Sequence, residues 1–264
     1  PPPPPPLPPP ASSLIAKRLR SPVTWISAAA TLTALYAAYE IQYRRQLNRE
    51  RVAGRPDLGG PFELLDVGGR TVRDTDLRGQ WALLYFGFTK CPDICPQEME
   101  KLTAVLTRLD AKGQPVLPVF ITIDPQRDDA ARLKGYFAEM DYHPRFMALT
   151  GSFDAVKRAC RSYRVYFSKP TAEEMKDGDY LIDHSIISYL VDPDGEFVEY
   201  FGKSLSADET EAKMTKLIGE WEAERYWRTR LPAPLANLVL GPPPPPKLPR
   251  QELPRLPPKV VPKA

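Results

Sequence analysis

Residues 81–102, WALLYFGFTKCPDICPQEMEKL, join an apolar strand to an amphipathic helix through a loop that carries two cysteines. The first six residues form a continuous apolar run, which is typical of a strand buried on both faces of a sheet. The helix that follows places Met99 and Leu102 on one face. Cys91 and Cys95 are therefore expected where the carboxyl end of a strand meets a helix, which is where α/β sheets gather their ligands.

Strand-like and helix-like segments alternate on either side of this loop. The expected elements are a hairpin at residues 62–72, a strand at 116–123, a helix at 128–140, a strand at 146–149, a helix at 152–163, a short edge strand at 165–167, a hairpin at 184–202 and a closing helix from residue 206. Ser152 is the expected N-cap of its helix, and Ser206 forms a predicted capping box with Glu209. This order predicts an α/β domain with a central mixed sheet flanked by helices on both faces.

The composition excludes some classes of function. The chain has 36 basic and 33 acidic residues, a formal net charge of +3. No broad basic surface of the kind that binds nucleic acid is expected from this balance. Three cysteines are too few for a disulfide scaffold, and two of them share one motif, so the cysteines indicate local chemistry.

A membrane anchor is predicted upstream of the domain. The stretch VTWISAAATLTALYAAY at residues 23–39 contains no charged residue. As a helix it is about 25 Å long, and its extension to Tyr43 approaches the hydrocarbon thickness of about 30 Å. Trp25 and Tyr43 lie near opposite ends, as in an aromatic belt. Basic residues flank both sides, so charge leaves the orientation open.

Prolines are concentrated at the two ends of the chain. The tracts at residues 1–10 and 241–259 favour polyproline II rather than helix or sheet. The chain starts at Pro1 instead of Met, as expected of a mature form whose targeting peptide has been removed. The predicted organisation is a Pro-rich basic segment at 1–20, a transmembrane helix at 21–43, a linker at 44–60, a folded domain at 61–224 and a Pro-rich extension at 225–264.

The cysteine loop allows three interpretations: a metal site, a dithiol/disulfide redox pair or a structural disulfide. Pro96 suits the first helical position, so that Cys95 is expected near the N-cap, where the helix dipole lowers the pKa of its thiol. The spacing C-x-x-x-C leaves more room between the sulfurs than C-x-x-C, and a soft metal ion fits that gap.

A third ligand is sought among the two histidines and the remaining cysteine. His184 starts an apolar strand and follows Asp183, so that a polar pair interrupts a hydrophobic stretch, and its imidazole can reach over the sheet edge toward the cysteine loop. His143 is expected to be a surface or capping histidine, and Cys160 a buried structural thiol. Two thiolates and one imidazole suit copper, especially Cu(I), whereas structural zinc normally takes four protein ligands.

The segments YFGFTKCPDICPQEMEKL, FITIDPQRDD, HPRFMALTG, YRVYF and DHSIISYLVDPDGEFVEYFG occur in this order. Through them the chain resembles the Sco family (synthesis of cytochrome c oxidase), and the resemblance covers roughly residues 58–222. The resemblance implies a thioredoxin-like fold. It also implies a single-pass anchor in the mitochondrial inner membrane with the domain in the intermembrane space, or in a bacterial inner membrane with the domain on the periplasmic side.

Carried over by position, the resemblance implies that Cys91, Cys95 and His184 bind copper. It implies a structural or indirect role for Asp183, and Asp93 and Asp124 are expected to shape the mouth of the site. The implied function is a copper metallochaperone for the dinuclear copper centre of cytochrome c oxidase subunit II. The alternatives are a thiol-disulfide oxidoreductase that uses Cys91 and Cys95, and a structural accessory subunit of a respiratory complex.

The same resemblance implies two partners, subunit II and an upstream copper donor chaperone. The Pro-rich tails suggest contacts with other respiratory complex subunits. The tails have no counterpart in the family pattern.

Overall fold

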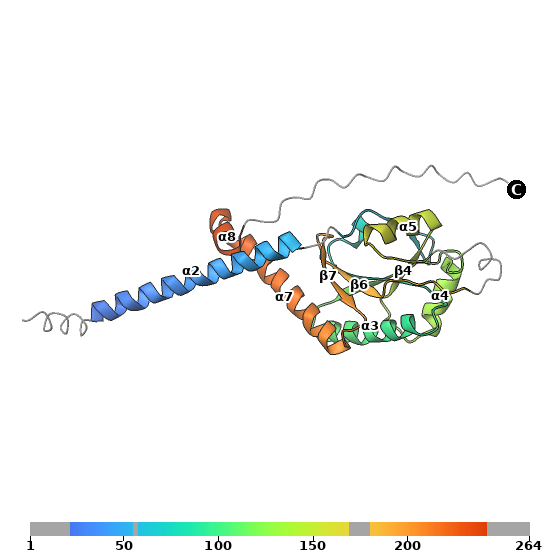
Figure 1. The fold of residues 1–264 in the computed structure, drawn as a ribbon, viewed down its shortest axis with the longest axis horizontal. Coiled ribbons are helices and arrows are strands. Elements are labelled where there is room, and N and C mark those ends of the chain that lie inside the picture. Colours follow the sequence, from blue (N-terminus) through green and yellow to red (C-terminus); the bar gives the residue numbers. More distant parts are fainter. Residues whose placement is uncertain (1–21, 55–57, 169–179, 242–264) are drawn as a thin grey trace, which may run out of the picture. The chain divides into compact units, whose positions relative to one another are not determined.

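A computed structural model describes residues 22–54, 58–168 and 180–241 of the chain (Figure 1). These residues fall into two compact units. One unit comprises residues 58–223, and the other combines residues 22–54 with 224–241. The larger unit contains the sheet and the cysteine loop.

A single seven-stranded sheet forms the centre of the larger unit. Its strands are β1 (Glu63–Asp66), β2 (Thr71–Arg73), β3 (Trp81–Gly87), β4 (Val116–Thr122), β5 (Met147–Thr150), β6 (Ile187–Val191) and β7 (Phe197–Gly202), in the spatial order β2-β1-β5-β4-β3-β6-β7. The pairs β3–β4 and β4–β5 are parallel, and the remaining neighbours are antiparallel. The sheet is therefore mixed, as predicted.

Helices cover both faces of this sheet, with α5 on one side and α3 on the other (Figure 1). In the described residues the helices of the domain are α3 (Ile94–Ala111), α4 (Ala130–Glu139), α5 (Phe153–Ser162) and α7 (Ala207–Arg230), with a short 3₁₀ helix η1 at Asp74–Leu77. Val156 of α5 packs in the core on one face, while Leu106 of α3, Leu133 of α4 and Met214 of α7 pack in the core on the other.

The central strand β3 supplies side chains to both cores. Leu84 and Phe86 pack on the face covered by α5, whereas Leu83 and Tyr85 pack on the face covered by α3. All seven residues of β3 are buried. The continuous apolar run in the sequence thus corresponds to a strand covered on both faces.

The predicted helix starts agree with the structure at both capping sites. The Ser152 side chain accepts a hydrogen bond from the Ala155 N–H at the start of α5. At the start of α7, the Glu209 N–H donates to Ser206 Oγ and the Ser206 N–H donates to the Glu209 carboxylate. The predicted strand at 165–167 is reduced to one isolated bridge, from Phe167 to His184.

In residues 22–54 and 224–241, the described part of the smaller unit, there are two helices and the end of a third. Helix α2 (Pro22–Gly54) contacts α8 (Ala233–Leu240), and α7 continues to Arg230. The helix predicted at 21–43 thus exists and extends through part of the predicted linker. In the described parts of the chain no helix combines the length and apolarity needed to cross a membrane. The predicted proline tracts lie almost wholly outside the described residues.

Candidate metal centre

The topology brings the cysteine loop and His184 to the same edge of the sheet. Cys91 lies in the loop after β3, and Cys95 lies in the first turn of α3. Strand β6 runs antiparallel beside β3, with Ser188 opposite Tyr85 near the carboxyl end of β3. The segment that enters β6, including His184, therefore arrives beside the loop that leaves β3.

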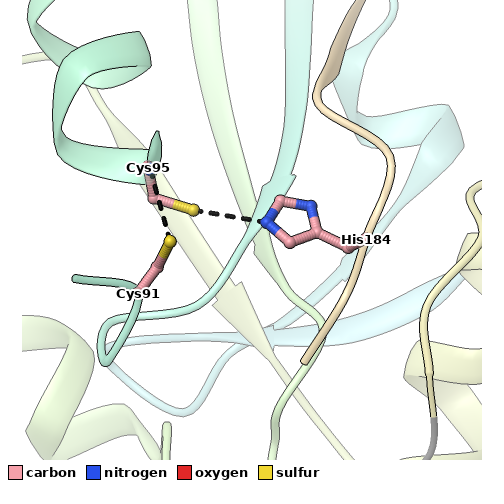
Figure 2. A group of neighbouring side chains, drawn as sticks. All are labelled: Cys91, Cys95 and His184. Carbon is pink, nitrogen blue, oxygen red and sulfur yellow. Dashed lines mark hydrogen bonds between the residues drawn. The ribbon is translucent and has the colours of Figure 1, made fainter. Parts of the chain in front are cut away.

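Three potential ligand atoms converge at this edge (Figure 2). The sulfurs of Cys91 and Cys95 and one imidazole nitrogen of His184 all lie within 4.8 Å of one another. Cys95 Sγ is 3.5 Å from His184 Nε2, and the Cys95 backbone N–H donates to Cys91 Sγ over an N···S distance of 3.5 Å. Both cysteines are free thiols or thiolates, because no disulfide joins them. The three ligand residues predicted from the sequence therefore lie together in the structure.

The His184 ring is oriented for ligation through Nε2. Its Nδ1 lies 3.0 Å from the Ser185 carbonyl oxygen, which can only accept a hydrogen bond. The proton therefore belongs on Nδ1, and the Nε2 lone pair faces the sulfurs. The Phe88 ring contacts the imidazole edge-to-face, with a centroid distance of 5.8 Å. A backbone carbonyl and an aromatic ring together fix the tautomer and the tilt of the ring.

The two cysteines differ in protonation. The Cys95 thiol donates to the Cys91 sulfur, and the backbone N–H groups of Cys95 and Ile94 donate to the same sulfur, so that the pKa of Cys91 falls to about 3 despite partial burial. The pKa of Cys95 is raised, because it donates to the Cys91 thiolate and because it is fully buried. Without metal the pair therefore holds one proton, on Cys95.

The sequence prediction for this loop was wrong about which sulfur the helix activates. Helix α3 begins at Ile94 with Asp93 as its N-cap, so Pro96 is the third helical residue and not the first. This places the Cys95 N–H among the unpaired donors of the first turn, where it points at Cys91 Sγ. The helix terminus stabilises a thiolate at Cys91, while burial keeps Cys95 protonated.

The three aspartates named from the sequence do not join the metal-ligating cluster that the described residues form. Asp93 and Asp183 are exposed, and Asp93 makes no side-chain capping bond. Asp124 is buried; its carboxylate pairs with Arg127 and accepts a hydrogen bond from the Tyr180 hydroxyl at 2.8 Å. Its role in the described structure is to hold these neighbouring segments together.

Cys160 is a buried thiol, as predicted, whereas His143 differs from the surface or capping histidine that was expected. His143 is only 6% exposed, so it is a buried histidine and not a surface one. Its Nε2 lies 3.1 Å from an Asp110 carboxylate oxygen, and its backbone N–H donates to Thr103 Oγ1. Cys160 is fully buried in the core beneath α5, and burial raises the pKa of its thiol to about 12.

Sequence reasoning missed the buried Asp128, which supports the cysteine loop. Its carboxylate accepts hydrogen bonds from the Thr89 N–H at 3.0 Å, the Thr89 hydroxyl at 2.6 Å and the Thr122 hydroxyl at 2.7 Å. The Thr150 hydroxyl donates to the Asp128 carbonyl oxygen at 2.7 Å. Asp128 thereby joins the carboxyl ends of β3, β4 and β5. The sequence shows a threonine at or near the end of each of these three strands. It does not show that their hydroxyls meet at Asp128, because that depends on the order of the strands in the sheet.

A second missed residue is Tyr85, whose hydroxyl donates to Cys95 Sγ at 3.4 Å from within the core. Tyr85 belongs to the apolar run of β3, where an aromatic residue is expected for packing alone. The periodicity of a strand buried on both faces contains no signal for this contact.

The chain is similar to one known family of proteins. The family described as SCO1/SenC matches residues 50–219. The chain is 40% identical over 204 residues to the protein sco1 of Schizosaccharomyces pombe, covering 75% of each chain. It is 48% identical to the mitochondrial SCO2 homolog of Mus musculus, over 64% of this chain and 65% of that protein. The crystal structure of yeast Sco1 with copper bound superposes with a TM-score of 0.60 at 44% identity, covering 67% of this chain and 97% of that one.

Proposed function

This chain belongs to the SCO1/SenC family, and we propose that it is a copper metallochaperone that assists assembly of the dinuclear copper centre of cytochrome c oxidase subunit II. The observation that carries the proposal is the convergence of Cys91, Cys95 and His184 within 4.8 Å. A copper-bound structure of a 44% identical relative adds to it. Relatives from Mus musculus and Saccharomyces cerevisiae are described as mitochondrial, which supports a mitochondrial location for this chain.

The donor set fits copper as a cargo. Two thiolate sulfurs and an imidazole nitrogen are soft to intermediate ligands, and Cu(I) accepts three of them. Cys91 is already a thiolate, and His184 presents a free Nε2 lone pair. Cys95 must release its proton when copper binds, so the binding of one copper ion releases about one proton from the pair.

The difference in exposure between the two sulfurs suggests which of them exchanges copper with a partner first. Cys91 is partly exposed, whereas Cys95 is fully buried. We infer that a dithiol of subunit II, or of an upstream copper donor chaperone, exchanges first with Cys91, while Cys95 and His184 hold the ion until the second ligand arrives. Copper then moves by ligand exchange, without a change in its oxidation state.

The ligand set is tested by metal analysis and X-ray absorption spectroscopy of the full chain in detergent. We expect one copper per chain with two sulfur ligands and one nitrogen ligand, and loss of the nitrogen ligand with at least tenfold weaker binding in His184→Ala. The other histidine of the sequence provides the matched control, since His143→Ala removes a buried imidazole that does not belong to the cluster of Cys91, Cys95 and His184. Full-affinity binding by His184→Ala would refute the three-ligand site.

A thiol-disulfide oxidoreductase is the second candidate, because the pair holds a low-pKa thiolate next to a thiol. In this function Cys91 attacks a disulfide of subunit II, and Cys95 resolves the mixed disulfide, so that two thiols of the chain are oxidised as the target disulfide is reduced. Reduction of a subunit II disulfide by the His184→Ala variant at the wild-type rate would favour this function over copper delivery.

Attachment to the mitochondrial inner membrane through α2, with the domain in the intermembrane space, is a further part of the proposal. Its support is the uncharged sequence at residues 23–39 and the exposed apolar side chains of Trp25, Leu32 and Leu35. Carbonate extraction tests the attachment, and protection from protease until the outer membrane is opened tests the compartment. An accessory-subunit function through the Pro-rich tails stays a prediction, because those tracts lie outside the described residues.

A further inference from the structure

Tyr85 places a phenol hydroxyl against the inner cysteine of the site. The side chain projects from β3 into the core beneath α3 and has no exposed surface. Its hydroxyl donates to Cys95 Sγ, with an O···S distance of 3.4 Å. A buried phenol normally satisfies its hydroxyl, and here the partner is a sulfur that also faces His184 Nε2.

Packing holds the ring and the sulfur in contact. The Tyr85 ring lies against Phe120 of β4, with a centroid distance of 6.2 Å. A Cβ atom at Gly87 would lie 2.9 Å from Tyr85 Cε1 and 3.1 Å from Cys95 Sγ. The space for this contact therefore depends on a glycine at position 87. The close packing leaves little freedom for the hydroxyl to turn to another acceptor.

The hydrogen bond acts on the electron density of the sulfur. In the metal-free chain the Tyr85 O–H donates to the Cys95 sulfur, whose thiol donates to the Cys91 thiolate, so this chain of hydrogen bonds stabilises the negative charge of the reduced pair relative to the neutral disulfide. In the water-excluded core this effect is larger than at the surface. Hydrogen bonds to a thiolate ligand likewise tune the redox potential of the bound metal, since they reduce the electron donation of the sulfur.

We propose that Tyr85 is a positioning residue that keeps the site in its reduced state: it favours the dithiol over the Cys91–Cys95 disulfide, and Cu(I) over Cu(II). The copper half of this inference rests on the proposed function, whereas the disulfide half needs only the two cysteines. A copper carrier gains from such a residue because the metal is bound only while both sulfurs remain reduced.

The first experiment uses the metal-free full chain and the variant Tyr85→Phe, which keeps the ring and removes the hydroxyl. Each protein is equilibrated with glutathione buffers, in which the two thiols and oxidised glutathione give the intramolecular disulfide and two reduced glutathiones. We expect the equilibrium constant for oxidation to rise about three- to tenfold in Tyr85→Phe. Tyr189→Phe is the matched control, because this buried tyrosine of β6 packs on the opposite face of the sheet.

The second experiment uses Cu(II) as an optical probe. Loss of the hydrogen bond leaves the copper-bound Cys95 thiolate a stronger electron donor, so the sulfur-to-copper charge-transfer band of Tyr85→Phe should move to lower energy. Copper content and thermal midpoint are measured in the same samples. A role in packing alone would change the midpoint and leave the band and the disulfide equilibrium unchanged.

A third variant makes the proposal falsifiable even if Tyr85→Phe folds less well. Site-specific 3-fluorotyrosine at position 85 is a more acidic and stronger donor, so both measurements should shift in the direction opposite to Tyr85→Phe. Equal values for Tyr85→Phe and Tyr189→Phe, or shifts of the same sign for phenylalanine and fluorotyrosine, would overturn the role of Tyr85. Failure of the wild-type chain to bind copper would overturn the proposed function alone, and the disulfide equilibrium would still decide the role of Tyr85.

Discussion

Cys91 and Cys95 belong to one motif but differ in charge, because their surroundings in the folded chain differ. Cys91 is partly exposed and faces the N–H groups at the start of α3. Cys95 is fully buried between the Tyr85 hydroxyl and the His184 imidazole. The first sulfur is therefore prepared to react or to bind metal, and the second is protected from solvent.

The protonation of Cys91 can be measured by its reactivity. Because its pKa is lowered to about 3, the thiolate is fully formed from about pH 5 upward. Its alkylation by iodoacetamide in the reduced, metal-free chain should therefore be nearly independent of pH between 5 and 8. An ordinary thiol of pKa about 8.5 accelerates about tenfold per pH unit in this range. Mass spectrometry of the labelled peptide provides the rate.

Cys91→Ser is the control for this measurement. Its two remaining cysteines are buried, so the fast, pH-independent labelling should disappear. A wild-type rate that rises steadily up to pH 8 would show that the Cys91 sulfur is not a stabilised thiolate.

At this scale the sequence predicted the ligands better than their chemistry. His184 could be found because a polar pair interrupts an apolar strand, and residue type alone identifies thiolates and imidazole as ligands. The charge of each sulfur could not be found, because it depends on where α3 begins. A shift of two residues in that boundary transfers the helix N–H groups from Cys95 to Cys91.

The loop between β3 and α3 takes its shape from a residue of a different loop. Asp128 precedes α4, yet it accepts both the N–H and the hydroxyl of Thr89, two residues before Cys91. It also accepts the Thr122 hydroxyl at the end of β4. The position of the reactive sulfur thus depends on the connection between β4 and α4.

Substitution of Asp128 by Asn tests this dependence. The carboxylate accepts all three hydrogen bonds, and the neutral amide has one acceptor oxygen in place of two and lacks the charge that strengthens these bonds. We expect a loss of about 1 to 3 kcal/mol in the free energy of unfolding and weaker copper binding. Urea denaturation and copper titration measure the two effects.

The neighbouring Asp129→Asn is the matched control. Asp129 is the N-cap of α4 and accepts the Arg132 N–H, and Asn is as good an N-cap as Asp. Stability and copper affinity should therefore stay near wild type in this variant. Equal losses in both variants would mean that general damage to the start of α4 is responsible.

The main elements of the domain could be predicted because their periodicity is strong. The apolar run at residues 81–86 became the central strand, and the capping residues Ser152 and Ser206 mark true helix starts. The strand expected at 165–167 shrank to a bridge, because only Phe167 has a paired partner, His184, in the described residues. Short segments of this kind are decided by tertiary pairing and not by local pattern.

At the scale of the whole molecule, α7 is shared between the two compact units, whose boundary lies between Ala223 and Glu224. Its first part belongs to the domain: Met214 and Ile218 are fully buried in the core, and Trp221 packs edge-to-face on Trp81 at 5.6 Å. The later part belongs with α2 and α8. The domain should therefore end where this helix leaves the sheet.

Two truncations locate this end. A chain that stops after Ala223 should retain one copper per chain and a wild-type denaturation midpoint for the domain. A chain that stops after Lys203 lacks Met214 and Ile218, and it should lose several kcal/mol of stability because two buried side chains are removed from the core. Equal stability of the two truncated chains would show that α7 is not part of the domain.

The architecture of the domain could be predicted from the order of its strands and helices. The segments outside the domain were harder to predict. The mixed sheet and its helices follow from alternating patterns over residues 61–224. Helix α8 was not foreseen, because Pro232 and Pro234 mark the segment as a breaker, although proline is tolerated in the first turn of a helix.

The distance along the chain between the ligands has a consequence for biogenesis. Cys95 and His184 meet across 89 residues, and the strands that bring them together are neighbours only in the finished sheet. An incompletely folded chain offers two cysteines without the imidazole, and a chain that holds copper in the three-ligand site has already formed its sheet. Retention of copper in the three-ligand site therefore depends on completed folding, and the bound ion in turn stabilises the folded chain against unfolding.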